Sequence, residues 1–249
     1  MGYEHSTYCE PSCAHERLVS VGKQAQSELQ FPGSKSWGGW RDGAGRSKRK
    51  DDVAHGSREK VTPHDPRLVT MKCAEGLPSM RTAEAGEVLV ECIRRAQKEA
   101  FRIVHFSIQV NHLHLIVEAN DDVALASGMK GLGCRVARGL NRVWQRAGAV
   151  FAGRFHDRVL QSFRQVRNAL RYVLNNYLKH RCSMTVNERG EQVPDIFSSG
   201  IYFDGWSDHP QEYEPGGPGE YVARGGWKIS EGWKRRSALI ALASVPGQC

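Results

Sequence analysis

The sequence lacks any long apolar run, and this absence excludes a membrane-spanning helix. No stretch approaches the roughly 18 consecutive apolar residues that a span requires. The first ten residues, MGYEHSTYCE, have neither a basic start nor an apolar core, so we expect no secretory signal. The 7 cysteines are odd in number and irregularly spaced, which argues against a disulfide framework. We therefore expect reduced thiols and a cytoplasmic protein.

Acidic residues are scarce in the middle of the chain. The whole chain has 35 Lys plus Arg against 27 Asp plus Glu, a formal net charge of +8. Between Lys130 and Arg181 there are 12 Lys plus Arg and a single acid, Asp157, a local balance of +11. A solvated helix face normally mixes both signs, so this bias predicts binding to nucleic-acid phosphates. The arginines of this region expected at the phosphates are Arg135, Arg138, Arg142, Arg154 and Arg158.

By composition the chain divides into three parts. Residues 1–62 contain little that can form a core, because glycine and charge dominate them. Residues 63–182 have clear hydrophobic patterning and are expected to form the folded domain. Residues 183–249 lack periodicity and are expected to be mostly irregular. Apolar residues near their end favour docking of that last part on the domain: Trp227, Ile229, Trp233, Leu239, Ile240 and Leu242.

We expect the N-terminal part to be a flexible basic arm, since it cannot bury enough surface to offset its ordering entropy. Its cations Arg46, Lys48 and Arg49 lie between glycines and are predicted phosphate contacts. The alternative is a solvated tail that contacts nothing.

The patterning of the folded part predicts an α+β domain with a ferredoxin-like sheet. Strands are expected over 67–73, 101–110, 112–119 and 151–160, and helices over 84–100, 123–146 and 162–180. Thr82 and Ser162 are the expected N-caps of the first and last helices. Asn111 is the only turn-forming residue between the second and third strands, so one of those boundaries must shift. Up to the last helix, the order is the split βαβ pattern, to which a helix bearing tyrosine is added.

Two histidines begin the third expected strand. His112 and His114 point to the same strand face, about 7 Å apart along the chain, while Leu113 faces the core. Two imidazoles in this arrangement can bind one divalent ion, although two ordinary histidines at a strand end would give the same pattern. Glu118 lies roughly 13 Å from His114 on that face, too far to complete the site. A third ligand must come from another element.

The last expected helix carries two tyrosines in different settings. Tyr177 belongs to the apolar stripe and is expected in the core, whereas Tyr172 lies about 240° from Val166, off that stripe. Asn168 and Asn176 lie one turn on either side of Tyr172. Such a tyrosine is commonly only a surface residue, but beside a metal it can be a nucleophile. The amide of Asn176 can supply the missing metal ligand.

These residues together resemble a known bacterial family. NHLHLIVEA (111–119) resembles the HUH motif, two histidines around one hydrophobic residue on a strand. RYVLNN (171–176) resembles the tyrosine-helix motif of the REP-associated tyrosine transposases and their insertion-sequence relatives. The 58 residues from His114 to Tyr172 are about what the family shows. Three more segments are similar to the family: GRFHDRVLQS (153–162), WGGWRDGAGR (37–46) and GGWKISEGWKRR (225–236).

The resemblance implies a metal-dependent tyrosine transposase that acts on single-stranded or hairpin DNA, in transposition or in a domesticated role. His112 and His114 would bind Mg²⁺ or Mn²⁺, and Asn176 matches the amide that completes the metal site in relatives. Tyr172 would attack the scissile phosphate, leaving a 5′-phosphotyrosine and a free 3′-OH that can rejoin strands without ATP. Relatives include monomers and homodimers, so either state fits. Many relatives have Asn-Pro where Asn176-Tyr177 stands here, so the helix is expected to continue further.

Two other functions stay open from the sequence. One is a catalytically silent nucleic-acid-binding module on the same scaffold. Like the enzyme, it is expected in the cytoplasm, associated with the nucleoid through its binding to DNA. The other is a zinc site, for which Cys9, Cys13 and His15 are candidate ligands, although a second paired motif is missing.

Overall fold

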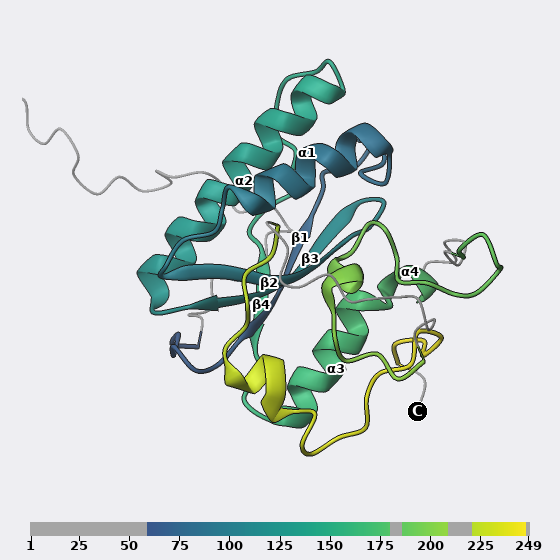
Figure 1. The fold of residues 1–249 in the computed structure, drawn as a ribbon. Helices are drawn as coiled ribbons and strands as arrows, with labels where there is room; N and C mark the ends of the chain where they lie inside the picture. Colours follow the sequence, from purple (N-terminus) through teal and green to yellow (C-terminus); the bar gives the residue numbers. More distant parts are fainter. Residues whose placement is uncertain (1–58, 180–185, 209–220, 248–249) are drawn as a thin grey trace, which may run out of the picture. The chain divides into compact units, whose positions relative to one another are not determined.

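A computed structural model of the chain describes residues 59–179, 186–208 and 221–247 (Figure 1). The predicted phosphate contacts Arg46, Lys48 and Arg49 lie outside these residues, as do the candidate zinc ligands Cys9, Cys13 and His15. Within the described ranges, no helix is both long and apolar enough to cross a membrane.

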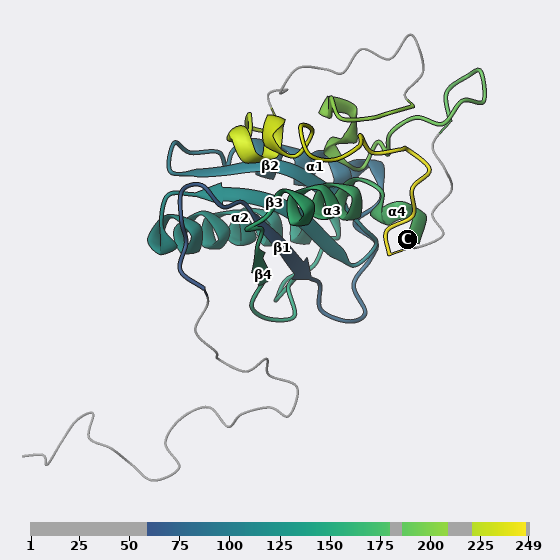
Figure 2. The same cartoon turned by 90° about the horizontal axis from the view of Figure 1, so that it is seen from below.

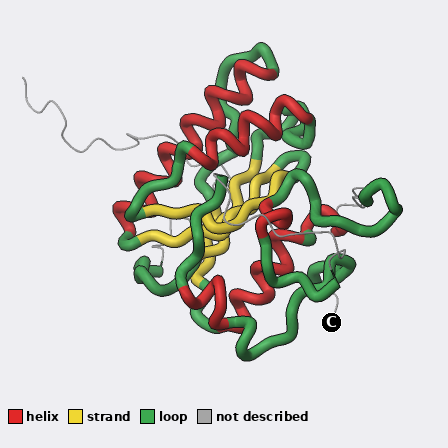
Figure 3. Tube along the Cα trace, viewed as in Figure 1, coloured by secondary structure: helices red, strands yellow, loops and turns green. Residues whose placement is uncertain are grey.

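The described residues form an α+β domain around a four-stranded sheet. The strands lie in the order β2-β3-β1-β4, and every neighbouring pair is antiparallel. Figure 3 shows the strands in yellow between the red helices. The bounds are Arg67–Lys72 for β1, Phe101–Ile108 for β2, His112–Ala119 for β3 and His156–Val159 for β4.

Three of the strand predictions differ from the structure at their ends. β2 ends at Ile108, two residues before its predicted end, and the chain turns over residues 109–111. The boundary that shifts at Asn111 is therefore the end of the second strand. β1 stops at Lys72, one residue before the predicted end. The strand predicted over 151–160 is wrong in extent, because β4 pairs with β1 over four positions only and Phe151 makes an isolated bridge further back. β3 has the predicted bounds.

Helices α1 (Ala83–Arg94) and α2 (Asp122–Val143) pack against each other and on the sheet. The Thr82 side chain accepts a hydrogen bond from the Ala85 N–H, which confirms it as the N-cap of α1. The prediction that this helix runs to residue 100 is wrong. The chain reverses after α1 because the Gln97 amide bonds both backbone groups of Ile103 and leads directly into β2.

Helix α3 (Phe163–Leu174) begins at a capping box made by Ser162 and Gln165, which confirms the predicted N-cap. The prediction that the helix continues to about residue 180 is wrong, because α3 ends at Leu174 and a four-residue helix, α4 (Asn176–Lys179), follows. The physical cause is Asn175 at the C-cap. Its amide nitrogen donates to the backbone oxygens of Ala241 and Ser244, which ties the helix end to the C-terminal segment.

The two faces of the sheet are covered by different layers (Figure 2). On one face, the alternate residues of β1 and β3, including Val69 and Leu115, pack with α1 and α2. On the other face, Ile116 packs with α3 and with the C-terminal segments. The tail contributes six of the described buried side chains to this second core: Phe203, Trp206, Ile229, Trp233, Ile240 and Leu242.

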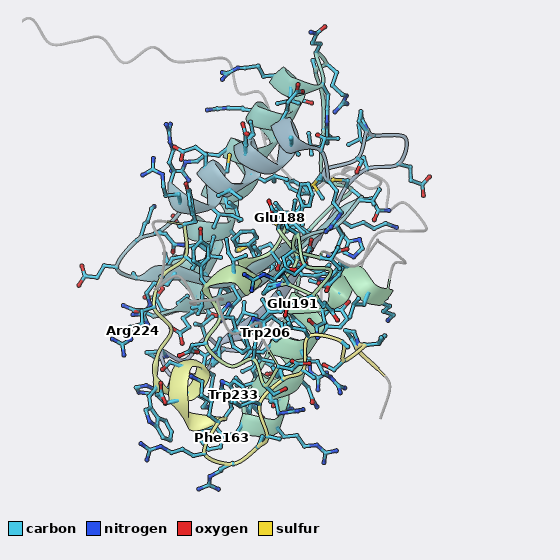
Figure 4. All side chains as sticks on the ribbon, turned by 45° about the vertical axis from the view of Figure 1, so that its right-hand side comes forward. Phe163, Glu188, Glu191, Trp206, Arg224 and Trp233 are labelled. Carbon is cyan, nitrogen blue, oxygen red and sulfur yellow. The ribbon has the colours of Figure 1, made fainter. Side chains whose placement is uncertain are left out.

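The C-terminal segments contain two short helical turns, η1 (Ser199–Tyr202) and η2 (Lys228–Gly232). Figure 4 shows the side chains of Trp206 and Trp233 beside α3, where the ring of Phe203 contacts both tryptophans. Two tail residues from the apolar set, Trp227 and Leu239, are instead exposed. The tail therefore covers the sheet face that carries the candidate site.

Candidate active site

Strand β3 places His112 and His114 side by side. The two side chains leave the same face of the strand, and their ring centroids are 4.6 Å apart with the rings nearly perpendicular. Leu113 between them is fully buried in the core under α1 and α2. The alternation of strand side chains thus directs both imidazoles toward α3. His114 is buried and His112 is partly exposed.

Helix α3 brings Tyr172 to this pair. The Tyr172 hydroxyl lies 3.4 Å from Nε2 of His114, and the two ring centroids are 4.9 Å apart. The buried stripe of α3 contains Val166, Ala169, Leu170, Val173 and Leu174, as predicted. Tyr172 lies at the margin of that stripe, partly buried, with its hydroxyl directed at the histidine. Residues that are 58 positions apart in the sequence therefore meet in one place.

Thr70 on β1 contacts His114 from the other side. The pairing register sets Thr70 opposite His114, and a 2.9 Å hydrogen bond joins Thr70 Oγ1 to Nδ1 of the histidine. With Nδ1 occupied, Nε2 is the nitrogen that faces Tyr172. Sequence patterning missed this residue, because only the pairing of β1 with β3 reveals that Thr70 and His114 share a face.

Asn176 is the predicted third ligand, and its surroundings differ from the expectation. It begins α4 instead of lying within one continuous helix after Tyr172. The residue is fully buried, and neither its side-chain oxygen nor its nitrogen has a hydrogen-bond partner among the described residues. An orphaned buried amide is costly unless something binds it. Two adjacent imidazoles and an amide oxygen are donor types that fit a divalent ion, and the Asn176 amide makes no hydrogen bond to either histidine.

Tyr177 belongs to the core, as predicted. It is almost fully buried, and its hydroxyl accepts a hydrogen bond from the Gln192 amide. Burial raises the pKa of this tyrosine above its ordinary value. A phenol with a raised pKa and a protein partner is poorly suited to nucleophilic attack, so the two tyrosines have separate roles.

A cavity of about 470 Å³ opens beside Tyr172. Its walls come from β1, from the end of β4, from α3 and from the C-terminal residues Pro246 and Gly247. Of the residues that the structure describes, no acidic side chain lines it. The one acid of the basic region, Asp157, is buried in an ion pair with Arg67.

The predicted DNA contacts separate into different places. Arg158 lines the cavity beside Tyr172, and Arg154 is exposed in the turn before β4. The three arginines of α2 instead line a groove with α1, on the opposite side of the sheet from α3. These three are Arg135, Arg138 and Arg142. These arginines of the +11 region therefore lie on two surfaces and not in one patch around the tyrosine, and Glu87 and Glu91 also line the α2 groove.

Arg171 also lines the cavity and was not singled out by sequence reasoning. Its position next to Tyr172, within the acid-poor region, is the signal that identifies it. Glu118 is engaged elsewhere, as its spacing predicted. Its carboxylate accepts hydrogen bonds from the Arg102 guanidinium and from the backbone N–H of Gly226.

Comparison with known proteins adds little to this geometry. No family model matches the chain, and no curated protein matches it. The chain is similar to a solved REP-associated tyrosine transposase bound to a REP hairpin, with 14% identity and a TM-score of 0.43, over 53% of this chain and 76% of that one. It is also similar to a putative transposase from Deinococcus radiodurans, with 11% identity and a TM-score of 0.34, over 52% of this chain and 97% of that one. At these values the likeness carries no inference about function.

Proposed function

We propose that the chain is a metal-dependent DNA-strand transferase of the REP-associated tyrosine transposase type, which nicks and rejoins single-stranded or hairpin DNA. One observation carries the proposal: the Tyr172 hydroxyl is 3.4 Å from Nε2 of His114, beside the second imidazole of His112. A tyrosine with only a structural role would not require two neighbouring histidines. The element order β1-α1-β2-β3-α2-β4 further supports a ferredoxin-like arrangement of the sheet.

The proposed reaction is a transesterification at one phosphorus atom. The Tyr172 oxygen attacks the scissile phosphate, a bond from phosphorus to the tyrosine oxygen forms, and the bond to the 3′ oxygen breaks. The tyrosine proton is transferred away and the 3′ oxygen acquires one, so the products are a 5′-phosphotyrosine and a free 3′-OH. One P–O bond replaces another, and no ATP is needed for the reverse step that joins strands.

His112, His114 and Asn176 are the residues that would hold a divalent ion, Mg²⁺ or Mn²⁺. Such an ion supplies Lewis-acid polarisation of a phosphoryl oxygen. Thr70 holds the His114 ring with Nε2 toward the site. The buried amide of Asn176 would supply an oxygen donor, which has no hydrogen-bond partner among the described residues.

The phosphate backbone would be bound by the arginines around the cavity. Among the described residues that line the cavity, Arg158 and Arg171 have no acidic neighbour, so their charge is available to an anion. The groove lined by Arg135, Arg138 and Arg142, together with Glu87 and Glu91, would provide a second phosphate-binding surface across the sheet. A hairpin with a duplex stem and a single-stranded end suits two such surfaces, whether the protein acts as a monomer or a homodimer.

The test is covalent trapping. The full chain is incubated with single-stranded hairpin oligonucleotides taken from the DNA that flanks its own gene, with Mn²⁺, and analysed on denaturing gels. We expect a protein–DNA adduct whose phosphate maps to Tyr172 by mass spectrometry of the digested protein. Binding to these hairpins without any adduct would instead identify a catalytically silent nucleic-acid-binding module.

A further inference from the structure

The cavity beside Tyr172 has more features than phosphate binding requires. Its polar lining includes Arg158, Arg171 and Tyr172. Its apolar lining includes Leu68, Leu160 and Ala169, and Leu68 is paired with Arg158 across the sheet. A volume of about 470 Å³ falls in the range of roughly 300–1,000 Å³ that small-molecule sites occupy.

The amides in this cavity are available to a ligand to different degrees. The Gln165 oxygen is already held by the backbone N–H groups of Gln161 and Ser162, so only its nitrogen can donate. Asn168 is exposed at the cavity and makes no hydrogen bond among the described residues, so its amide offers both a donor and an acceptor. Asn168 lies one turn of α3 before Tyr172, on the same side of the helix.

We infer that this cavity binds one unpaired nucleotide of the strand, preferably an adenine nucleotide, next to the scissile phosphate. The phosphate contacts Arg158 and Arg171, the base lies against Leu68 and Leu160, and the Asn168 amide bonds the base edge. The preference for adenine follows from the amide, because Asn pairs with adenine through its N6 amino group and N7. This inference rests on the proposed function, since it names the base beside the phosphate that Tyr172 attacks.

The C-terminal segment completes the cavity. Pro246 and Gly247 form part of its wall. Their position is fixed by Asn175 at the end of α3, which bonds the backbone of Ala241 and Ser244. The same helix therefore carries the tyrosine, the base-binding amide and the anchor of the wall.

The test measures nucleotide binding to the full chain without any catalysis. Dissociation constants are determined by calorimetry for 5′-dAMP, 5′-dCMP, deoxyribose 5-phosphate and inorganic phosphate. We expect dAMP to bind about tenfold more tightly than dCMP, and both nucleotides to bind more tightly than the two phosphates without a base. Equal constants for dAMP and inorganic phosphate would overturn the base site, and equal constants for the two nucleotides would overturn recognition by Asn168.

Three variants on one helix separate the parts of the site. Arg171→Ala should weaken every ligand about tenfold, because it removes a charged hydrogen-bond donor. Arg164→Ala removes the same charge from an exposed position of α3 outside the cavity, and should change binding by less than about twofold. Asn168→Ala should remove the preference for dAMP and leave inorganic phosphate unaffected. Equal losses in the two arginine variants would show general charge attraction and overturn the assignment.

Failure of this inference and failure of the proposed function give different results. An adduct at Tyr172 together with absent nucleotide binding overturns the nucleotide site alone. Nucleotide binding with the stated preferences, but without an adduct on any hairpin, overturns the transferase alone.

Discussion

The sheet face under α1 and α2 and the face under α3 bury different kinds of side chain. On the first face, β1 and β3 contribute mostly apolar residues, such as Val69 and Leu115, and the charged Arg67 there is buried in an ion pair. On the second face the same strands contribute Thr70 and His114, beside the apolar Ile116. Because burying a polar group costs free energy unless it is hydrogen-bonded, the polar groups of the second face need an explanation beyond the packing of the core.

The polar groups on the second face are held by specific partners. His114 is bonded to Thr70, and the buried His105 is bonded to the Ser199 hydroxyl. A bulge in β2 between Ile103 and His105 sets His105 opposite Ile116 on this face. Both sides of the sheet therefore bury a hydrophobic core, and the second side in addition brings Thr70, His114 and Tyr172 together.

Exchange of the two tyrosines of this layer is the strongest test of the comparison. Tyr172→Phe removes the proposed nucleophilic oxygen and should abolish the covalent adduct, while DNA binding stays nearly intact. Tyr177→Phe is the matched control, since it deletes the same atom from a core position and should retain most activity. Denaturing gels measure the adduct and fluorescence anisotropy measures the binding. An inactive Tyr177→Phe of normal stability would reverse the assignment.

Removal of either imidazole should have the next largest effect. His112→Ala or His114→Ala should eliminate metal-dependent cleavage, because each removes a ligand, and the fold should survive as judged by circular dichroism. EDTA should stop the wild-type protein in the same way. A variant that cleaves at the wild-type rate with Mg²⁺ would show that the metal is bound elsewhere, and the polar face would then lose its functional meaning.

Substitution of Thr70 tests whether His114 is held in a specific orientation or is only buried. Thr70→Val keeps the shape of the side chain and removes the hydrogen bond to His114 Nδ1. Loss of such a supporting bond typically lowers metal affinity or activity about tenfold to a hundredfold. Mn²⁺ affinity by electron paramagnetic resonance and the nitrogen chemical shifts of His114 give readouts besides activity.

Thr70→Ser is the control for this experiment, since it retains the hydroxyl. We expect it to restore both the Mn²⁺ affinity and the histidine tautomer. If Thr70→Val leaves the His114 nitrogen shifts unchanged, the threonine has no positioning role.

Much of the fold follows from local sequence patterns. The alternation of HLHLIVEA predicts β3 with its observed bounds, and Ser162 followed by Gln165 predicts the start of α3. Helix ends were harder to predict, because the contacts that end them come from distant residues. α3 stops where Asn175 bonds the backbone of Ala241, 66 positions away, and no local pattern carries that information.

The candidate site likewise contains residues that the sequence predicts and residues that only the tertiary structure reveals. His112, His114 and Tyr172 can be named from sequence, since strand and helix periodicities decide which side chains share a face. Thr70 and the cavity wall at Pro246 cannot, because they depend on strand pairing and on the path of the tail. The net charge of a sequence region also does not reveal where its charged side chains lie in the fold. The arginines of α2 belong to the same basic region of the sequence as Tyr172 but lie across the sheet from it.

Acid should destabilise the second face through His105. Burial lowers the pKa of this histidine from 6.5 to about 4, so it is neutral in the folded protein at neutral pH. The unfolded chain takes up the proton first as the pH falls below 6.5, so stability is complete above that pH and is lost toward pH 4. The expected loss between pH 7 and pH 5 is about 2 kcal/mol.

Urea unfolding at several pH values measures this loss, with His105→Asn as the reference. The variant lacks the titrating ring, so its free energy of unfolding should be less dependent on pH in this window by about the same 2 kcal/mol. Equal pH dependence in the two proteins would show that His105 does not titrate on unfolding as described.

The smallest expected effect concerns the charge of the N-terminal residues. Deletion of the basic arm should weaken DNA binding without unfolding the domain. The structure decides where to cut: the guanidinium of the buried Arg67 donates to the backbone oxygens of Glu59 and Lys60, so the deletion should remove residues 1–58 and not 1–60. A cut after Lys60 would remove two backbone partners of this buried cation, which would keep only its ion pair with Asp157 among its described partners, and would confuse stability with affinity.

The readout of this deletion is the dependence of binding on salt. Each phosphate neutralised on a single strand contributes roughly −0.7 to the slope of log K against log salt concentration. If three cations of the arm, such as Arg46, Lys48 and Arg49, contact phosphates, the slope should become shallower by about two units. An unchanged slope and affinity would mean that the arm contacts no DNA, because counterion release cannot be lost without phosphate contacts. Binding would then rest on the two basic surfaces of the domain, and the effect of Arg171→Ala should be the same with or without the arm.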